Sequence, residues 1–139
     1  MRHALSFAWQ TLGLLIAATV GVSAQTLGAP LSKGTDEVAV YRQQCAGGQM
    51  ITCRILGTMY EDGRGGLQRN EREAVRLHPQ ACDGGHMFGC VNLAVMYERG
   101  RGDLQMDLQF AMRLYHHGCD GDEKRGCQRV EAGKYPDTS

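Results

Sequence analysis

The residues of this 139-residue chain that could most readily do chemistry are six cysteines, which fall into three pairs. Seven residues separate the two cysteines of each pair, and each pair begins 37 residues after the previous one. Two thiols at such a spacing can form a disulfide, can bind a metal ion as thiolates, or can act as a redox pair. The six positions are Cys45, Cys53, Cys82, Cys90, Cys119 and Cys127.

The spacing within the pairs does not favour a metal site. Structural zinc prefers about two to four residues between paired cysteines, with two further ligands nearby. His86 lies inside the central pair, but Gln49 and Glu123 occupy the matching positions of the other pairs. His116 and His117 could also bind a metal, although an exposed helix end is the simpler interpretation. A C-x-x-C redox motif does not occur. We therefore expect no metal and no cofactor.

The first 24 residues have the pattern of a secretory signal peptide. Arg2 and His3 form a basic tip, residues 12–22 form a short apolar run, and small residues lead up to Ala24. A membrane-spanning helix needs about 20 apolar residues, so an uncleaved anchor is the less favoured interpretation. We expect cleavage after Ala24, a secreted or periplasmic mature chain, and no membrane association afterwards. An even number of cysteines in such a compartment favours disulfides.

The overall charge is compatible with a protein partner and gives no indication of a nucleic-acid partner. The formal net charge of the full chain is zero, and removal of the signal peptide with Arg2 would make it minus one. Domains that bind nucleic acid usually present a strongly basic face. We therefore expect no nucleic-acid partner.

No catalytic residues can be named from the sequence. Serine β-lactamases use an S-x-x-K motif, whereas the expected mature chain has only Ser32 and Ser139, and neither begins that motif. The sequence also has no H-x-H-x-D metal signature and suggests no Ser-His-Asp arrangement. The catalytic residues are therefore unknown if the chain is an enzyme.

The cysteine pairs belong to an internal repeat of 37 residues. Residues 45–81 align without gaps on residues 82–118, and 17 of the 37 positions are identical. A fixed period of this size is typical of stacked helical repeats. Partial copies precede and follow the two full ones, so we expect a repeat domain over residues 36–134. Residues 25–35 are then a loose leader and residues 135–139 a loose tail.

Each repeat has the pattern of two helices. Apolar residues recur at helical spacing over residues 50–62, and Gly63 is a natural stop. Asn70 with Glu73 forms a capping box for a second helix that ends near residue 80. Pro79 lies inside this second helix, so we expect the helix to kink or end early there. With the same pattern over residues 87–99 and after Asp107, the sequence predicts six helices in three antiparallel hairpins.

Three short motifs carry a family resemblance. They are A-x-x-L-Y, G-C-x-N-L at residues 89–93, and M-Y-x-x-G-x-G, which occurs twice. Together they resemble Sel1-like repeats, and the C-x7-C pairs resemble the cysteine-rich branch typified by the Helicobacter cysteine-rich proteins. The resemblance implies an all-α solenoid of TPR-like helix hairpins with one disulfide in each hairpin. The implied pairs are Cys45–Cys53, Cys82–Cys90 and Cys119–Cys127.

The same resemblance implies several functions. Sel1-like proteins are adaptors that bind other proteins, which makes a protein or peptide partner the leading expectation. Some cysteine-rich members are described as penicillin-binding proteins with weak β-lactamase activity, so a β-lactam or peptidoglycan-related ligand is the alternative. A mitochondrial relative linked to haem makes haem or metal carriage a remote third option.

The expected binding face consists of the first-helix residues outside the apolar stripe. A solvated helix face without a partner is the alternative interpretation for each of them. Asn92 occupies the asparagine of the G-C-x-N-L motif, whereas Ile55 stands at the equivalent position one repeat earlier. The candidate residues are Arg54, Thr58, Glu61, Asn92, Val95 and Glu98.

Overall fold

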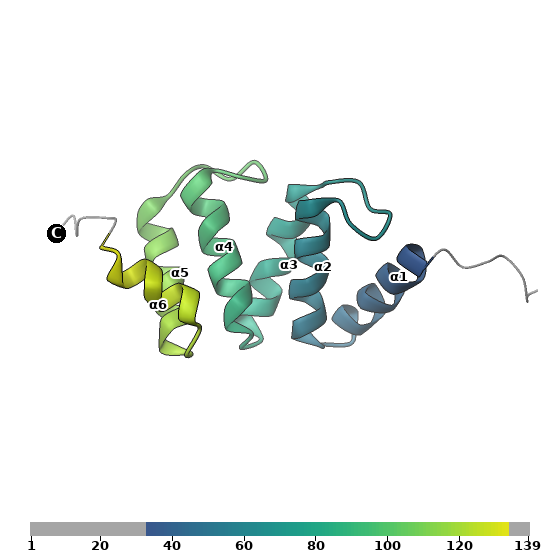
Figure 1. The fold of residues 1–139 in the computed structure, drawn as a ribbon, viewed down its shortest axis with the longest axis horizontal. Helices are drawn as coiled ribbons and strands as arrows, with labels where there is room; N and C mark the ends of the chain where they lie inside the picture. The colour runs from purple at the N-terminus through teal and green to yellow at the C-terminus, as the bar shows by residue number, and fades with distance from the viewer. Residues whose placement is uncertain (1–32, 134–139) are drawn as a thin grey trace, which may run out of the picture.

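The computed structural model describes residues 33–133, which form six α-helices and no strand (Figure 1). The predicted signal peptide, most of the leader and the tail lie outside these described residues. No helix among residues 33–133 is long and apolar enough to cross a membrane. The helices are α1 (Lys33–Ala46), α2 (Met50–Asp62), α3 (Glu71–Asp83), α4 (Met87–Arg99), α5 (Leu108–Asp120) and α6 (Lys124–Glu131).

The helices form a row of antiparallel hairpins in which each helix packs against the next one along the chain. In Figure 1 the row is elongated, with α1 and α6 at its opposite ends. The two full repeats contribute α2–α3 and α4–α5, and α1 and α6 are the flanking halves. The predicted all-α solenoid of helix hairpins is therefore confirmed, with the bounds of α2 and α4 at the predicted residues.

Local sequence explains where these helices begin and end. The side chains of Asn70 and Asp107 accept hydrogen bonds from the backbone N–H groups three residues on, at Glu73 and Phe110. Such caps satisfy backbone donors that a helix leaves free at its first turn. Gly63 and Gly100 end α2 and α4 in the left-handed conformation, with φ of 69° and 62°, which glycine adopts without steric cost.

Three helix pairs are connected by short loops, namely α1–α2, α3–α4 and α5–α6, and a disulfide joins the two helices of each pair. The bonds are Cys45–Cys53, Cys82–Cys90 and Cys119–Cys127, as the family resemblance implied. The described residues contain no free cysteine. Close helix packing beside two of these bonds requires glycine. A Cβ atom on Gly89 would lie 2.7 Å from the Cβ of Ala81, and one on Gly126 would lie 2.8 Å from the carbonyl oxygen of Tyr115.

The core consists of the apolar stripes that the 3.6-residue period predicts. Leu56 and Met59 of α2 pack with Leu77 of α3 in the first repeat, and Val91 of α4 packs with Tyr115 of α5 in the second. All five side chains are buried. The repeats are thus held by helix-on-helix packing in addition to the disulfides.

The expectation for Pro79 was wrong where it predicted an early end, because α3 continues four residues beyond it to Asp83. A proline inside a helix lacks one N–H donor and therefore loses one helical hydrogen bond. Leu77 and Ala81 on either side of Pro79 are buried, and Cys82 is bonded to α4. These contacts hold the last turn of α3 in place. At the other end of the domain, α1 begins at Lys33, so the last three residues of the expected leader are helical.

Candidate functional site

A pocket of about 480 Å³ lies on the face that α2, α4 and α6 share. These three helices are consecutive first helices of the repeat, so residues far apart in the sequence meet there. We call this site the central pocket. Its lining residues are Arg54, Thr58 and Glu61 of α2, Phe88, Asn92 and Val95 of α4, and Arg125 of α6.

Five of the six candidate binding residues line the central pocket, and Glu98 lies outside its lining. The sequence-based list did not include Phe88 and Arg125. Phe88 is an apolar residue in the first turn of α4, and no sequence signal marked it as exposed. Arg125 belongs to the incomplete last repeat, from which no binding residue was predicted.

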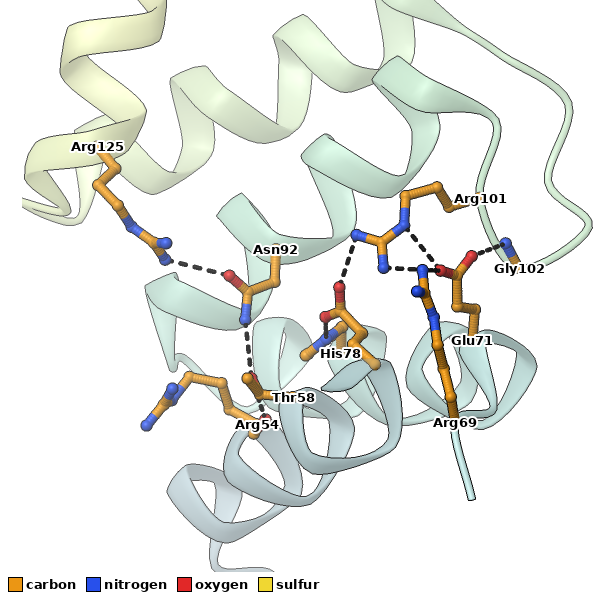
Figure 2. Close-up of polar contacts among 10 residues, drawn as sticks. Arg54, Thr58, Arg69, Glu71, His78, Asn92, Arg101, Gly102 and Arg125 are labelled. Carbon is orange, nitrogen blue, oxygen red and sulfur yellow. Dashed lines mark hydrogen bonds and ion pairs between the residues drawn. The ribbon is translucent and has the colours of Figure 1, made fainter. Parts of the chain in front are cut away.

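A chain of hydrogen bonds crosses the pocket from α6 to α2, as Figure 2 shows. Arg125 Nη2 donates to Asn92 Oδ1 at 3.1 Å, and Asn92 Nδ2 donates to Thr58 Oγ1 at 3.5 Å. The Thr58 hydroxyl donates to the backbone oxygen of Arg54 at 3.1 Å. Asn92 therefore holds the three helices in register while its own amide group is occupied.

Two guanidinium groups lie close to an exposed aromatic ring. Phe88 is 44% exposed although it is a large apolar residue. The guanidinium carbons of Arg54 and Arg125 lie 5.8 Å and 5.0 Å from the centre of its ring. Both contacts have the geometry of cation–π interactions, which hold a cation against the face of a ring. The pocket therefore offers an apolar surface bordered by two positive charges.

The two arginines differ in how their charges are balanced. Arg125 Nε donates to Glu123 Oε1 at 3.0 Å, and the Glu123 carboxylate is almost fully buried. Arg54 forms no ion pair with a described residue, and its buried Nε has no hydrogen-bond partner among them. Burial lowers the pKa of Arg54, and the positive charge of Arg125 lowers it further. Arg54 is thus a cation without a partner anion in the part of the chain that the structure describes.

Glu61, at the edge of the pocket, is already bonded within the protein. Its Oε1 lies 2.6 Å from Nε2 of the fully buried His78, and its Oε2 accepts from Arg101 Nη1 at 2.8 Å. Burial alone would raise the pKa of Glu61, but the contacts with His78 and Arg101 outweigh it, and the net pKa is lowered. Glu61 therefore contributes a carboxylate to the pocket lining whose two oxygens are already bonded within the protein.

Arg101 binds Glu61 and also Glu71 at the start of α3. Figure 2 shows its bonds to Glu71. Its Nη2 and Nε donate to Glu71 Oε1 at 2.8 Å and 3.1 Å, while Arg69 also pairs with Glu71. The backbone N–H of Gly102 donates to Glu71 Oε2 at 3.2 Å. These bonds join the loop after α4 to the previous repeat, so the two full repeats are fixed relative to each other.

Glu98 occupies the position equivalent to Glu61 one repeat later and is bonded in a similar way. The hydroxyl of the buried Tyr115 donates to Glu98 Oε2 at 2.6 Å, and Arg129 of α6 pairs with the same oxygen. Burial raises the pKa of Tyr115 strongly, and the Glu98 carboxylate adds to the rise. A second pocket of about 250 Å³ adjoins the central one and shares Val95 and Arg125 with it.

One group of possible metal ligands occurs among the described residues, and it combines the central cysteine pair with His117, one of the two adjacent histidines noted in the sequence. Atoms of Cys82, Cys90 and His117 lie within 4.8 Å of one another, whereas His86 is not part of this group. The two sulfurs are bonded to each other, so neither is a thiolate, the form in which cysteine binds metals. His117 is the one remaining donor of the group in the oxidised protein.

The comparison with known proteins addresses the family and the fold. The model of the Sel1 repeat matches residues 52–86 and 88–122, which together make up half of the chain. A solved structure, Helicobacter pylori cysteine rich protein B, is similar with a TM-score of 0.62 and 22% sequence identity, over 66% of this chain and 68% of that one. At this identity the likeness shows the fold alone. No curated protein matches the chain. Because the two family matches cover most of α2 to α5, the chain belongs to the Sel1 repeat family.

Proposed function

We propose that this Sel1 repeat protein is a secreted or periplasmic adaptor that binds a protein or peptide partner on the face formed by α2, α4 and α6. Membership of the Sel1 repeat family supports a role in protein–protein interaction. The observation that carries the proposal is the exposed ring of Phe88 in a pocket to which three helices contribute. Aromatic and arginine side chains are enriched at the energetically important positions of protein interfaces.

The rigidity of the face is a second support. Disulfides bind the first turns of α2, α4 and α6 to the preceding helices, and the bonds of Asn92 connect the three helices across the pocket. A surface that is already in its binding geometry loses less conformational entropy when a partner binds. This face therefore suits the recognition of a flexible segment of another protein.

The proposed location rests on the N-terminal pattern and the disulfides. Three disulfides among the described residues are typical of an extracytoplasmic protein. Residues 1–24 have the features of a cleavable signal peptide. Mass spectrometry of the protein recovered from its host tests the proposal, with a mature N-terminus at Gln25 expected.

We make no proposal of β-lactam hydrolysis for the central pocket. Residues 33–133 contain no serine. The one hydroxyl in the pocket lining, that of Thr58, donates to a backbone oxygen and accepts from Asn92. No general base is placed to activate it among these lining residues, because Glu61 is occupied by His78 and Arg101.

Site-specific photo-crosslinking tests the docking face. A photoreactive amino acid replaces Phe88 in one variant and Leu108 in a matched control, since Leu108 is similarly exposed at 37% but lies on α5 outside the pocket. We expect a defined protein adduct in envelope material with the Phe88 variant and none with the Leu108 variant. An adduct of equal yield from both positions, or from Leu108 alone, would contradict the proposed face.

A further inference from the structure

We infer that the central pocket binds the C-terminal carboxylate of a partner chain whose last residue is apolar. This inference rests on the proposed docking function and specifies the chemistry of the segment that docks. The unpaired guanidinium of Arg54 would receive the carboxylate, and Phe88 would receive the apolar side chain. The observations that carry it are the charge balance of the pocket and the position of the exposed ring.

Among residues 33–133, the charged groups around the pocket leave one surplus positive charge. Glu123 neutralises Arg125, while Arg101 and Arg69 neutralise Glu61 and Glu71. The remaining charge is that of Arg54. A guanidinium binds a carboxylate through charge-assisted hydrogen bonds, which are stronger than bonds between neutral groups. A ligand that brings one carboxylate would therefore complete the charge balance of this pocket.

The buried Nε of Arg54 provides an independent indication of a missing acceptor. Buried polar atoms in folded proteins nearly always have a hydrogen-bond partner. Arg54 Nε has none among the described residues, and Arg54 lies beside Phe88 in the lining of the pocket. Figure 2 shows that the guanidinium of Arg54 points away from the Arg125–Asn92–Thr58 chain. The chain of hydrogen bonds across the pocket therefore does not satisfy this guanidinium.

The charge of the site favours a chain terminus over a run of acidic side chains. Several carboxylates would bring more negative charge than one surplus cation can balance, and the Glu61 carboxylate at the edge would repel them. A C-terminal residue supplies a single carboxylate and a side chain on the same Cα atom. These two groups match Arg54 and the adjacent apolar surface of Phe88 and Val95.

Three acetylated heptapeptides of otherwise identical sequence test this inference in titrations with the mature protein. The first ends in Ala-Leu with a free carboxylate, the second is its C-terminal amide, and the third is an amide in which the alanine is replaced by glutamate. We expect the free acid to bind at least about tenfold more tightly than either amide, since a hydrogen bond to a charged group contributes about 1.5–3 kcal/mol and 1.4 kcal/mol corresponds to tenfold. Equal binding of the acid and its amide would overturn the inference. Equally tight binding of the glutamate peptide would assign the pocket to acidic side chains instead and would also overturn it.

Arg54→Met identifies the residue that recognises the carboxylate. We expect this variant to bind the free acid and the amide with a ratio near one, whereas Arg113→Met keeps the wild-type ratio. Arg113 is a matched control because its guanidinium also lies against a ring, that of Phe110, but on α5 outside the pocket. Arg54→Lys retains the charge and is expected to keep part of the preference. An undiminished preference in Arg54→Met would overturn the inference.

The photo-crosslinking experiment separates the failure of this inference from the failure of the docking function. If none of the three peptides binds while the Phe88 position still crosslinks to a protein, the carboxylate inference is wrong and the docking face stands. If Phe88 yields no adduct and no peptide binds, both are wrong.

Discussion

The imidazole of His78 and the carboxylate of Glu61 form a buried contact of 2.6 Å that joins the second helix of the first repeat to its first helix. One repeat later, Tyr115 and Glu98 occupy the same two positions, and their contact is also 2.6 Å. The carboxylate is retained while its partner changes from imidazole to phenol. Each full repeat is therefore closed by a polar bond as well as by apolar packing.

Gly57 makes room for the imidazole, and its replacement should destabilise the protein. A Cβ atom at this position would lie 2.7 Å from Cε1 of His78. We expect Gly57→Ala to lower the free energy of unfolding by about 1–3 kcal/mol, the usual cost of overpacking. The measurement is urea denaturation followed by circular dichroism.

The double variant Gly57→Ala/His78→Ala is the control for this prediction. Without the ring, alanine should be neutral or stabilising at position 57, because alanine in a helix is favoured over glycine by about 0.5–1 kcal/mol. Effects of the two substitutions that simply add would show that the contact between Gly57 and His78 is not the cause.

Acid should weaken the junction between the two repeats through Glu71. Hydrogen bonds from Arg101 and then from Arg69 lower the pKa of Glu71 from 4.5 to about 2. A carboxylate with a lowered pKa stabilises the folded state fully above the pKa of the unfolded chain, and this contribution is lost as the pH falls. We expect the stability difference between wild type and Glu71→Gln to be constant above pH 4.5 and to shrink between pH 4.5 and about 2.

The control for Glu71 is Glu73→Gln, which removes an exposed pair with Arg76 on the same helix. Exposed ion pairs usually contribute less than about 1 kcal/mol. A larger loss for Glu73→Gln than for Glu71→Gln in urea denaturation at neutral pH would contradict the role of Glu71 at the junction.

The disulfides should contribute unequally to stability. Replacing Cys82 and Cys90 by alanine opens a loop of nine residues in the middle of the row, and chain entropy predicts a loss of about 2–3 kcal/mol. Replacing Cys119 and Cys127 should affect mainly α6, which packs against α5 at the end of the row. Urea denaturation of the two double variants measures the free energy of unfolding of each. Equal losses of this free energy would contradict the predicted inequality.

Arg54 should be dispensable for folding even though it is central to the proposed site. The buried Nε of Arg54 has no hydrogen-bond partner among the described residues. Arg54→Met therefore removes a donor that does not stabilise the free protein through a hydrogen bond. We expect an unchanged or higher melting temperature. Arg101→Met is the comparison, because it leaves Glu61 and Glu71 without their shared partner and should cost about 1–3 kcal/mol.

Much of the fold could be predicted because the signals that form each helix lie within a short stretch of sequence and recur in each repeat. The caps at Asn70 and Asp107, the stops at Gly63 and Gly100, and the period of the apolar stripes all act within one helix or loop. The resemblance to cysteine-rich Sel1 repeats added the disulfide pairing. The effect of Pro79 was misjudged because burial of Leu77 and Ala81, which sustains the helix, is a property of the packed repeats.

The candidate site was less predictable because stacking of the repeats shifts the contacts by about one helical turn. Alignment at 37 residues pairs Asn92 with Ile55 and makes the polar positions look incomplete. In the structure Asn92 instead contacts Thr58 and Arg125, which are 34 and 33 residues away. The bonds that occupy Glu61 and Glu98 likewise come from other helices and from the loop after α4, so no pattern within α2 or α4 could indicate them.

The most direct test of the carboxylate site on the docking face is a map of backbone amide chemical shifts on addition of the free-acid heptapeptide. We predict saturable shifts centred on the pocket residues Arg54, Phe88, Asn92 and Arg125, and much smaller shifts when the amide is added at the same concentration. Saturable shifts confined to α3 and α5, with the lining of the central pocket unchanged, would contradict this prediction.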